Sequence, residues 1–317
     1  MKISAFAPAT LANFCVGFDV LGMALSPING ELWGDIVEIE TIGTENNRIL
    51  TVTGPFASRL PKDPNQNLVT KTLRLFENEL ASKNIPKKNL HISLSKNMPV
   101  SSGVGSSASS IVATLVALNA IYGANFKNEL LLKIAGECEG FVSGDAHYDN
   151  VAPCLLGGLQ LIVPDPFQPV RKLPFFSNYQ IIVVQPEIEL STKAMRAILP
   201  SQIPRSEALS QWKCLASFIH ALHTNDENLF HQSFTDSIAE PYRRSYIPGF
   251  DNIKHAALDA GALGCSIAGS GPALFAVSKN LNQSKNIAQV MMKNFTKNGI
   301  NSVSKICTVD LIGSRIL

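Results

Sequence analysis

The stretch PVSSGVGSS (residues 99–107) combines two glycines with four serines in nine residues. Gly103 and Gly105 carry no Cβ, so the backbone beside them can approach an anion closely. The serine hydroxyls can donate to phosphate or bind a metal ion. Residues 108–122 are an apolar run about as long as one buried helix, and Gly123 is placed to end it. Because the first amides of a helix lack intrahelical acceptors, the stretch predicts a phosphate-binding loop at a helix N-terminus.

Two other interpretations of this loop remain open. One is a tight strand-to-helix turn in which a serine serves as the helix N-cap. The other is a dinucleotide-binding loop, because Gly103, Gly105 and Ala108 fit the pattern G-x-G-x-x-A. The acidic residue nearest the position expected for a ribose contact, Glu129, lies in a helical pattern, which counts against that alternative. No lysine follows Gly105, so the loop is not a Walker A sequence.

Phosphoryl transfer also requires a metal ion and an oriented hydroxyl group. Mg²⁺ takes hard oxygen ligands and usually only one or two of them from protein. Ser107 offers a hydroxyl at the helix start, and Glu137 and Glu139 are the candidate carboxylates on a helix predicted at 128–141. Because these two residues are two positions apart, they point to different faces, and only one of them can serve.

Polar side chains also stand out in two other places. Asp19 lies between Phe18 and Val20 in an otherwise apolar stretch, so its carboxylate is either solvated at a turn or held for a purpose. His147 and Asp149 lie in a polar turn, and two such ligands are too few for zinc. We therefore interpret His147 as a hydrogen-bonding group of a substrate pocket.

Hydrophobic periodicity indicates the elements that position these residues in the first half of the chain. Period-two alternation predicts a strand at 91–96 that leads into the loop, and the polar turn separates the helix at 128–141 from another strand. A helical stripe begins near Asn67, where asparagine is a common N-cap. The remaining elements predicted in this half are strands at 2–6, 34–41 and 157–163 and a helix at 65–82.

A proline-rich connection at 164–176 separates this half from the second one and predicts a domain boundary near residue 165. The order of elements after it is strand, helices, strand, strand, helix, strand, which is a ferredoxin-like order. Gly269 and Gly271 lie in the turn between the two adjacent strands, where a hairpin is the simplest interpretation. The predicted elements are strands at 180–185, 265–268, 273–277 and 303–311 and helices at 206–223, 227–238, 250–260 and 286–298.

Composition excludes several classes of protein. A chain of 317 residues with 45% hydrophobic residues is long enough for two domains with large cores. The net charge of +2 gives no basis for binding nucleic acid or a membrane surface. The six cysteines form no CxxC pair, so we expect reduced thiols in a cytoplasmic protein. We expect neither a signal peptide nor a membrane span, because no apolar run reaches about 18 residues.

The sequence PVSSGVGSSAS resembles the second motif of the GHMP kinases, a family named for galacto-, homoserine, mevalonate and phosphomevalonate kinases. The family's first motif is matched by APATLANFCVGFDVLG (residues 7–22) and its third by SIAGSGPALFA (residues 266–276). The motifs occur in the family's order and span nearly the whole chain. SGDAHYDNVAP (residues 143–153) and EPYRRSYIPGF (residues 240–250) are similar to the members that phosphorylate homoserine.

The resemblance implies an α+β fold of two domains. Residues 1–165 would form an ATP-binding domain like domain 2 of ribosomal protein S5, and residues 166–317 a ferredoxin-like α/β domain whose glycine turn closes over the active site. The implied activity is ATP- and Mg²⁺-dependent phosphorylation of the side-chain hydroxyl of L-homoserine. A mevalonate-type kinase is the alternative within the family. A dinucleotide-dependent oxidoreductase and a scaffold that binds ATP without turnover are alternatives from other classes, and a homodimer is left open.

The resemblance also assigns roles to individual residues. In the family the metal-binding glutamate lies eight residues before the histidine of the polar turn, which selects Glu139 over Glu137. The catalytic group would comprise Asp19, Ser107 and Glu139, the last two as metal ligands, and whether Asp19 removes the hydroxyl proton stays open. The substrate would be bound by Asn13, Asp19, His147, Asp149, Thr192, Arg196 and Arg243, the two arginines holding its carboxylate. The nucleotide would be bound by Asn67, Pro99, Ser101, Ser102, Gly103, Val104, Gly105, Ser106, Ser107, Ala108, Ser109, Gly269 and Gly271.

Overall fold

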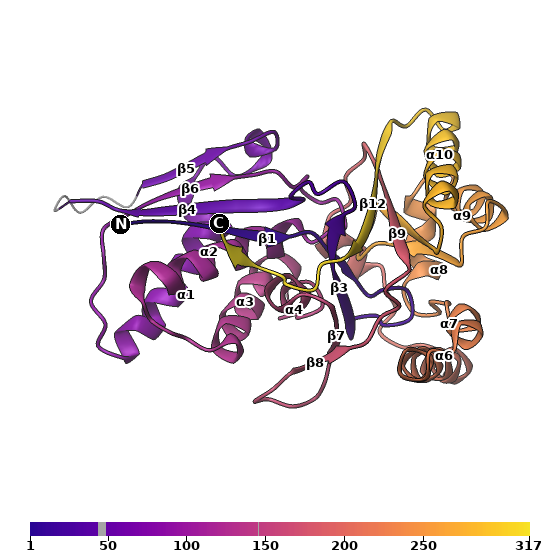
Figure 1. Ribbon diagram of the computed structural model, residues 1–317, viewed down its shortest axis with the longest axis horizontal. Coiled ribbons are helices and arrows are strands. Elements are labelled where there is room, and N and C mark those ends of the chain that lie inside the picture. The colour runs from indigo at the N-terminus through magenta and orange to yellow at the C-terminus, as the bar shows by residue number, and fades with distance from the viewer. Residues whose placement is uncertain (44–48, 145) are drawn as a thin grey trace.

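The computed structural model describes residues 1–43, 49–144 and 146–317, which form two parts lying side by side (Figure 1). The first part is built on a five-stranded sheet in the order β13-β1-β4-β6-β5. Its β5 pairs parallel with β6, and the other pairs are antiparallel. The bounds of its strands are β1 (Lys2–Pro8), β4 (Gly34–Thr41), β5 (Ile49–Thr53), β6 (Leu90–Ser95) and β13 (Arg315–Ile316).

Helices cover one face of this sheet (Figure 1). The central one, α2, is apolar on all sides and packs against β1 and β4 with α1 and α3 beside it, as expected of a buried helix. It begins at Ser106, behind Gly105, whose φ of 70° is left-handed. The alternative of a serine N-cap is wrong, because glycine occupies that position and no side chain caps the helix. The bounds are α1 (Leu68–Ser82), α2 (Ser106–Tyr122), α3 (Asn128–Ser143) and α4 (Val151–Leu156), with 3₁₀ turns η1 (Ala57–Arg59) and η2 (Pro64–Gln66) before α1.

The second part is built on an antiparallel sheet in the order β10-β11-β9-β12-β3-β7-β8, with β2 paired to β3. Strands β9 to β12 have the predicted ferredoxin-like order. The domain boundary near residue 165 stays a prediction, because β3 and β7 join this sheet from before it and β13 joins the first sheet from after it. The bounds are β2 (Thr10–Ala12), β3 (Leu21–Pro27), β7 (Leu159–Ile162), β8 (Val170–Leu173), β9 (Gln180–Pro186), β10 (Gly264–Ile267), β11 (Leu274–Ser278) and β12 (Ser302–Val309).

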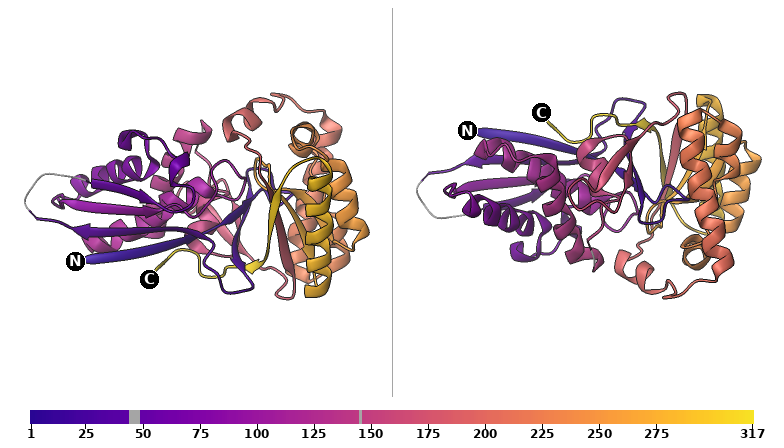
Figure 2. Two further views of the ribbon diagram at one scale, coloured as in Figure 1. Left: turned by 90° about the horizontal axis from the view of Figure 1, so that it is seen from above. Right: turned by 90° about the horizontal axis from the view of Figure 1, so that it is seen from below.

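Both faces of this sheet are covered, which explains why β9 is a continuous apolar run. Ile181 and Val183 pack into the cluster that includes Phe218 of α6, whereas Ile182 and Val184 pack into the cluster under α9 and α10. Figure 2 shows the long helices of this part, drawn in orange and yellow, at the end of the molecule away from the first sheet. Their bounds are α5 (Thr192–Ala197), α6 (Arg205–Thr224), α7 (Glu227–Gln232), α8 (Glu240–Arg243), η3 (Arg244–Tyr246), α9 (Phe250–Asp259) and α10 (Leu281–Lys297).

Two predicted helices depart most from their observed bounds. The helix predicted at 227–238 ends at Gln232. Beyond it, the carboxylate of Asp236 accepts from the N–H groups of residues 238–240 in the turn that leads into α8. The helix predicted at 286–298 begins earlier, at Leu281, where the side chain of Asn280 caps it.

Both ends of the chain lie at the first sheet. The N- and C-termini lie next to each other (Figure 2), because β13 returns from the second part to pair with β1. All six cysteines are free thiols, as predicted. Within residues 1–43, 49–144 and 146–317, none of the helices has the length and apolar content needed to cross a membrane. Asp145 of the predicted polar turn lies outside the described residues.

Candidate active site

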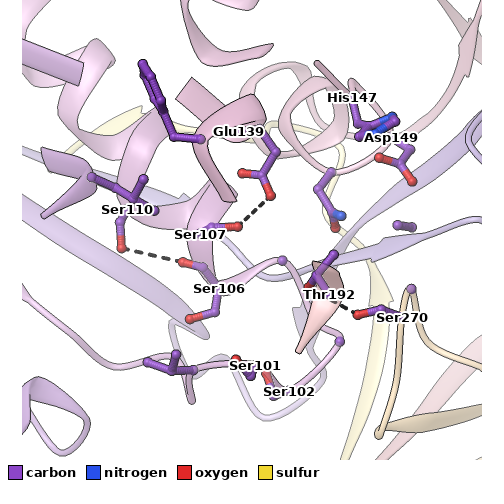
Figure 3. Close-up of a pocket in the computed structure, with 18 of the residues that line it drawn as sticks. Ser101, Ser102, Ser106, Ser107, Ser110, Glu139, His147, Asp149, Thr192 and Ser270 are labelled. Carbon is purple, nitrogen blue, oxygen red and sulfur yellow. Dashed lines mark hydrogen bonds between the residues drawn. The ribbon is translucent and has the colours of Figure 1, made fainter. Parts of the chain in front are cut away.

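A cavity of about 380 Å³ lies where the two parts meet, and the loop before α2 forms one of its walls (Figure 3). From the first part it is lined by the start of α1, the loop, the end of α3 and the turn after α3. From the second part it is lined by α5, α8 and the turn at 269–270. The sequence motifs, distant in the chain, therefore meet at one place.

The loop requires glycine because of its protein neighbours. Gly103 has φ 85°, and a Cβ there would stand 2.4 Å from the backbone oxygen of Ala268. Gly105 has φ 70°, and a Cβ there would stand 1.9 Å from Oγ1 of Thr10. An L side chain is disfavoured at both positions by backbone conformation and by space. The loop is thus packed closely against the first and third motifs before any ligand is considered.

Hydrogen bonds connect the three motifs directly. The backbone N–H of Ala273 donates to the oxygen of Ser102 at 3.2 Å, which fixes the glycine turn of the third motif on the loop. The side-chain amide of Asn13 donates to the oxygen of Gly269 at 3.1 Å. The turn between β10 and β11 therefore reaches across from the second part and forms one side of the cavity.

Ser107 and Glu139 form a pair of hard oxygen donors at the start of α2. Ser107 Oγ donates to Glu139 Oε1 at 2.7 Å, and Figure 3 shows the two side chains directed toward each other. Burial raises the pKa of Glu139, whereas the Ser107 hydrogen bond and the charge of Lys96 lower it. Glu137 is exposed on the outside of α3 and does not line the cavity. The structure thus places Glu139, and not Glu137, beside the loop.

This pair of oxygen donors suits Mg²⁺ better than it suits a metal ion that is bound entirely by protein side chains. Throughout the residues that the structure describes, no group of three or more His, Cys, Asp or Glu side chains could hold a metal ion. A hydroxyl and a carboxylate next to a phosphate-binding loop suit Mg²⁺, which takes few protein ligands and shares phosphate oxygens with its substrate.

At the other end of the cavity an aspartate and an arginine form a two-pronged ion pair. Arg196 donates from its two terminal nitrogens to the carboxylate oxygens of Asp19, at 2.9 and 2.8 Å. Asp19 has a left-handed φ of 59°, and its backbone N–H donates to Oδ1 of Asn13 at 3.0 Å. Nδ1 of His147 lies 3.9 Å from Oδ2 of Asp19. These predicted substrate residues lie together at one end of the cavity.

A second arginine lies deeper in the same end. Arg243 is only 3% exposed and donates to the backbone oxygens of Gly269 at 2.9 Å and Met195 at 3.2 Å. Burial lowers the pKa of its guanidinium, against the attraction of Asp236. The ring of Phe18 lies 5.7 Å from the guanidinium carbon of Arg196 and 5.3 Å from that of Arg243. Sequence reasoning noted Phe18 only as an apolar neighbour and missed this contact.

Asp149 adds a carboxyl group whose protonation is sensitive to its surroundings. It is buried, and burial is the main cause that raises its pKa to about 7, followed by the charges of Asp19 and Glu139. The nearby Arg196 acts in the opposite direction. A cationic ligand group in this cavity would favour the ionised form of Asp149.

Lys96 also lines the cavity, and sequence reasoning did not select it. A signal was available, because the alternation that buries Leu90, Ile92 and Leu94 continues to position 96 and places a lysine on the inward face. A lysine is rarely buried without a partner, and Asp35 is its partner here.

Some of the predicted nucleotide-binding residues do not line the cavity. Ser109 is fully buried, and its hydroxyl donates to the oxygen of Ala7 while accepting from the N–H of Asp35. The side chain of Asn67 does reach the cavity but caps α1, accepting from the N–H of Val69 at 3.0 Å. The residues of that prediction that lie outside the cavity lining are Pro99, Val104, Ala108, Ser109 and Gly271.

Comparison with known proteins identifies relatives of this chain. The family model for the GHMP kinases N terminal domain matches residues 67–158, and the model for the GHMP kinases C terminal domain matches residues 218–297. The crystal structure of homoserine kinase from Cytophaga hutchinsonii ATCC 33406 has 41% sequence identity and a TM-score of 0.90, over 100% of this chain and 97% of that one.

More distant structures share the fold. A putative homoserine kinase from Listeria monocytogenes has 21% identity and a TM-score of 0.70, over 99% of both chains. A mevalonate kinase of L. major, in complex with R-mevalonate, has 17% identity and a TM-score of 0.67, over 95% of this chain and 94% of that one.

Proposed function

The chain belongs to the GHMP kinase family, and on that premise we propose that it transfers the terminal phosphoryl group of ATP to the side-chain hydroxyl of L-homoserine. The full-length similarity to a homoserine kinase at 41% identity supports this substrate. The free thiols and the net charge of +2 support an enzyme that acts on small molecules in the cytoplasm, without nucleic acid or membrane.

The observation that carries the proposal is the division of the cavity into two ends. One end has the N-terminus of α2 with Ser107 and Glu139, which suits the phosphates of ATP. The other end has the ion pair of Asp19 with Arg196, and it lies beside the buried Arg243. L-Homoserine is a zwitterion with a primary hydroxyl, so its carboxylate and ammonium groups match the arginine and aspartate side chains, respectively.

The Asp19–Arg196 pair explains why a zwitterion would be preferred. Without a ligand, the two side chains neutralise each other. A zwitterion inserted between them offers a carboxylate to the guanidinium and an ammonium to the carboxylate, so neither of these partly exposed charges loses its partner. Mevalonate has a carboxylate but no ammonium, and would leave Asp19 and Asp149 without a cation. This difference favours homoserine over the mevalonate-type alternative.

The chain's own residues supply positioning and charge. The amides at the start of α2 would bind the phosphates, and Ser107 and Glu139 would hold Mg²⁺, which neutralises charge on the transferred group when bound. Asp19 would hold the substrate by its ammonium end. Because the transition state of phosphoryl transfer is loose, it needs little help from a base, and we assign Asp19 to positioning.

ADP release is the test of this proposal. We expect release with ATP and L-homoserine and much less with mevalonate, galactose or shikimate offered separately as acceptors. Equal or greater release with mevalonate would move the assignment to the mevalonate-type kinases. An oxidoreductase would instead turn over with NAD or NADP in the absence of ATP, and binding of ATP without ADP release would indicate a scaffold.

A further inference from the structure

A buried ammonium group lies beneath the first turn of α2. The side chain of Lys96 is 2% exposed, and its Nζ donates to Oδ2 of Asp35 at 2.5 Å. It also donates to the backbone oxygen of Ser106 at 2.8 Å and to Oγ of Ser110 at 3.0 Å. These contacts use all three N–H donors of an ammonium group. The group is therefore fixed in place without a ligand.

Asp35 connects this ammonium group to the backbone that leads into the loop. Its Oδ1 accepts from the N–H groups of Asn97 at 2.9 Å and Met98 at 3.0 Å. Its Oδ2 accepts from the hydroxyl of Ser110 at 2.6 Å, beyond the loop. One carboxylate thus holds both the entry and the exit of the phosphate loop. We call the pair of Asp35 and Lys96 the buried clamp.

The backbone oxygen that Lys96 contacts belongs to Ser106, one residue before the candidate metal ligand Ser107. Lys96 binds the oxygen of Ser106, and the next residue, Ser107, donates to Glu139 at 2.7 Å. Figure 3 shows Ser107 directed toward Glu139, while Ser110 leaves α2 on the other side. Among the described residues that line the cavity, Lys96 is present and Asp35 is not, so the cationic end of the clamp is the end nearer the cavity.

An ion pair is not required to fill this part of the core. Burial lowers the pKa of Lys96 and outweighs the attraction of Asp35, because removing an ammonium group from water disfavours its charged form. Apolar side chains of similar volume often replace a buried ion pair with no loss of stability. A fixed charge is more useful beside an anionic ligand, because preorganised charges act strongly where water is excluded.

We propose that Lys96, held by Asp35, is a positioning residue for phosphoryl transfer: it fixes the first turn of α2 so that the loop amides and the Ser107 hydroxyl meet the nucleotide phosphates without rearrangement. Lys96 acts through Ser106 and Ser107, from behind the loop. The expected effect of Lys96 on turnover rests on the proposed function, whereas its expected effect on nucleotide binding does not.

The test removes both charges of the clamp at once. The double variant Asp35→Asn/Lys96→Met leaves no buried charge unpaired, and the new amide keeps an oxygen for the N–H groups of Asn97 and Met98. We expect a parental melting temperature, a homoserine KM close to the parent's, and a kcat and ATP affinity lower by about tenfold to a hundredfold, as for a misplaced catalytic group. If the buried clamp only stabilised the fold, a double variant as stable as the parent would also have the parent's kcat and ATP affinity.

The control is Lys305→Met, because Lys305 also pairs with a carboxylate, that of Glu31, but does not line the cavity. It should match the parent in every assay. ADP release and calorimetric titration with a non-hydrolysable ATP analogue are measured on the same preparations. If the parent releases no ADP with homoserine, the proposed function fails, and the titrations still decide the role of Lys96.

A double variant that is as stable as the parent and has parental kcat and analogue affinity would overturn the proposal. If the double variant does not fold, Ser110→Ala decides instead, because it removes one contact of Lys96 and one of Asp35 without leaving a charge unpaired. Weaker binding of the analogue by a folded Ser110→Ala variant would support the proposal, and parental binding and turnover would overturn it.

Discussion

Arg196 holds Asp19 with both terminal nitrogens, and the same planar group suits the two oxygens of a substrate carboxylate. A hydrogen bond to a charged group contributes roughly 1.5–3 kcal/mol, which is about one to two decades in binding. We therefore expect Arg196→Leu to raise the homoserine KM at least tenfold while leaving ATP affinity nearly unchanged.

Homoserinol sharpens this prediction, because it keeps the hydroxyl and amine of homoserine but lacks the carboxylate. The parent should prefer homoserine, and the Arg196→Leu variant should lose most of that preference. Arg244→Leu is the control, since Arg244 is exposed and pairs with Asp251 on the surface. A variant that prefers homoserine by the parent's ratio would show that Arg196 does not bind the carboxylate.

Glu139 and Glu137 are two residues apart, and the structure buries the first and exposes the second. We expect Glu139→Gln to lower turnover and raise the Mg²⁺ concentration needed for half-maximal activity, because a site with few protein ligands loses an anionic one. Since burial raises the pKa of Glu139, the neutral variant should be no less stable than the parent. Glu137→Gln should behave as the parent, and the reverse pattern would assign the metal to Glu137.

Asp149 makes stability and binding depend on pH in opposite directions. Its pKa is raised from 3.8 to about 7, so between these values the folded chain keeps a proton that the unfolded chain releases. Its contribution to folding stability is therefore present below about pH 4 and is lost as pH rises toward 7. In the folded chain the ionised form of Asp149, which would bind the substrate ammonium group, appears as pH rises through about 7, so the homoserine KM should fall there. In Asp149→Asn both pH dependences should weaken, as followed by thermal unfolding and by initial rates.

At the scale of elements, the packing of the loop makes Gly105 sensitive to any added side chain. The sequence suggested that a larger side chain would displace a phosphate, whereas the structure places Oγ1 of Thr10 at 1.9 Å from the position of a Cβ. We expect Gly105→Ala to fold but to bind ATP weakly. The second variant, Thr10→Ala/Gly105→Ala, should recover part of the affinity, since a left-handed φ of 70° still costs about 1–2 kcal/mol. No recovery by ATP titration would show that the collision with Thr10 is not the cause.

Elements with a strong hydrophobic pattern were predictable from the sequence, whereas short elements stabilised by partners distant in the chain were not. The central helix and the strand at 91–96 were found because one is apolar throughout and the other alternates cleanly. Strand β13 has two residues and exists because it pairs with β1 at the opposite end of the chain. Lys96 was missed for a related reason, because its partner Asp35 lies 61 positions away and no local pattern joins them.

At the scale of the whole molecule, the two parts exchange strands. Strand β3 comes from the N-terminal part and pairs with β12 in the second sheet, and β13 returns to the first sheet. Ala273, just after the glycine turn at 269–271, also donates from its backbone N–H to the oxygen of Ser102 in the loop before α2. Neither half of the chain contains all the strands of its own sheet. The proline-rich connection near residue 165 therefore joins parts that should not be stable separately.

We accordingly expect thermal unfolding to be a single cooperative transition, with equal calorimetric and van't Hoff enthalpies. Cleavage in the exposed segment around Phe167, which is 82% exposed, should not release a folded half, because β3 would remain with one fragment and its partner β12 with the other. The proposed sites for ATP and homoserine lie where the parts meet, so the two ligands together should raise the transition temperature without splitting it. The measurement is differential scanning calorimetry with and without ligands, with limited proteolysis in parallel. Two resolved transitions, or a protease-resistant half that keeps its circular dichroism, would show that the boundary near 165 separates independently stable domains despite the exchanged strands.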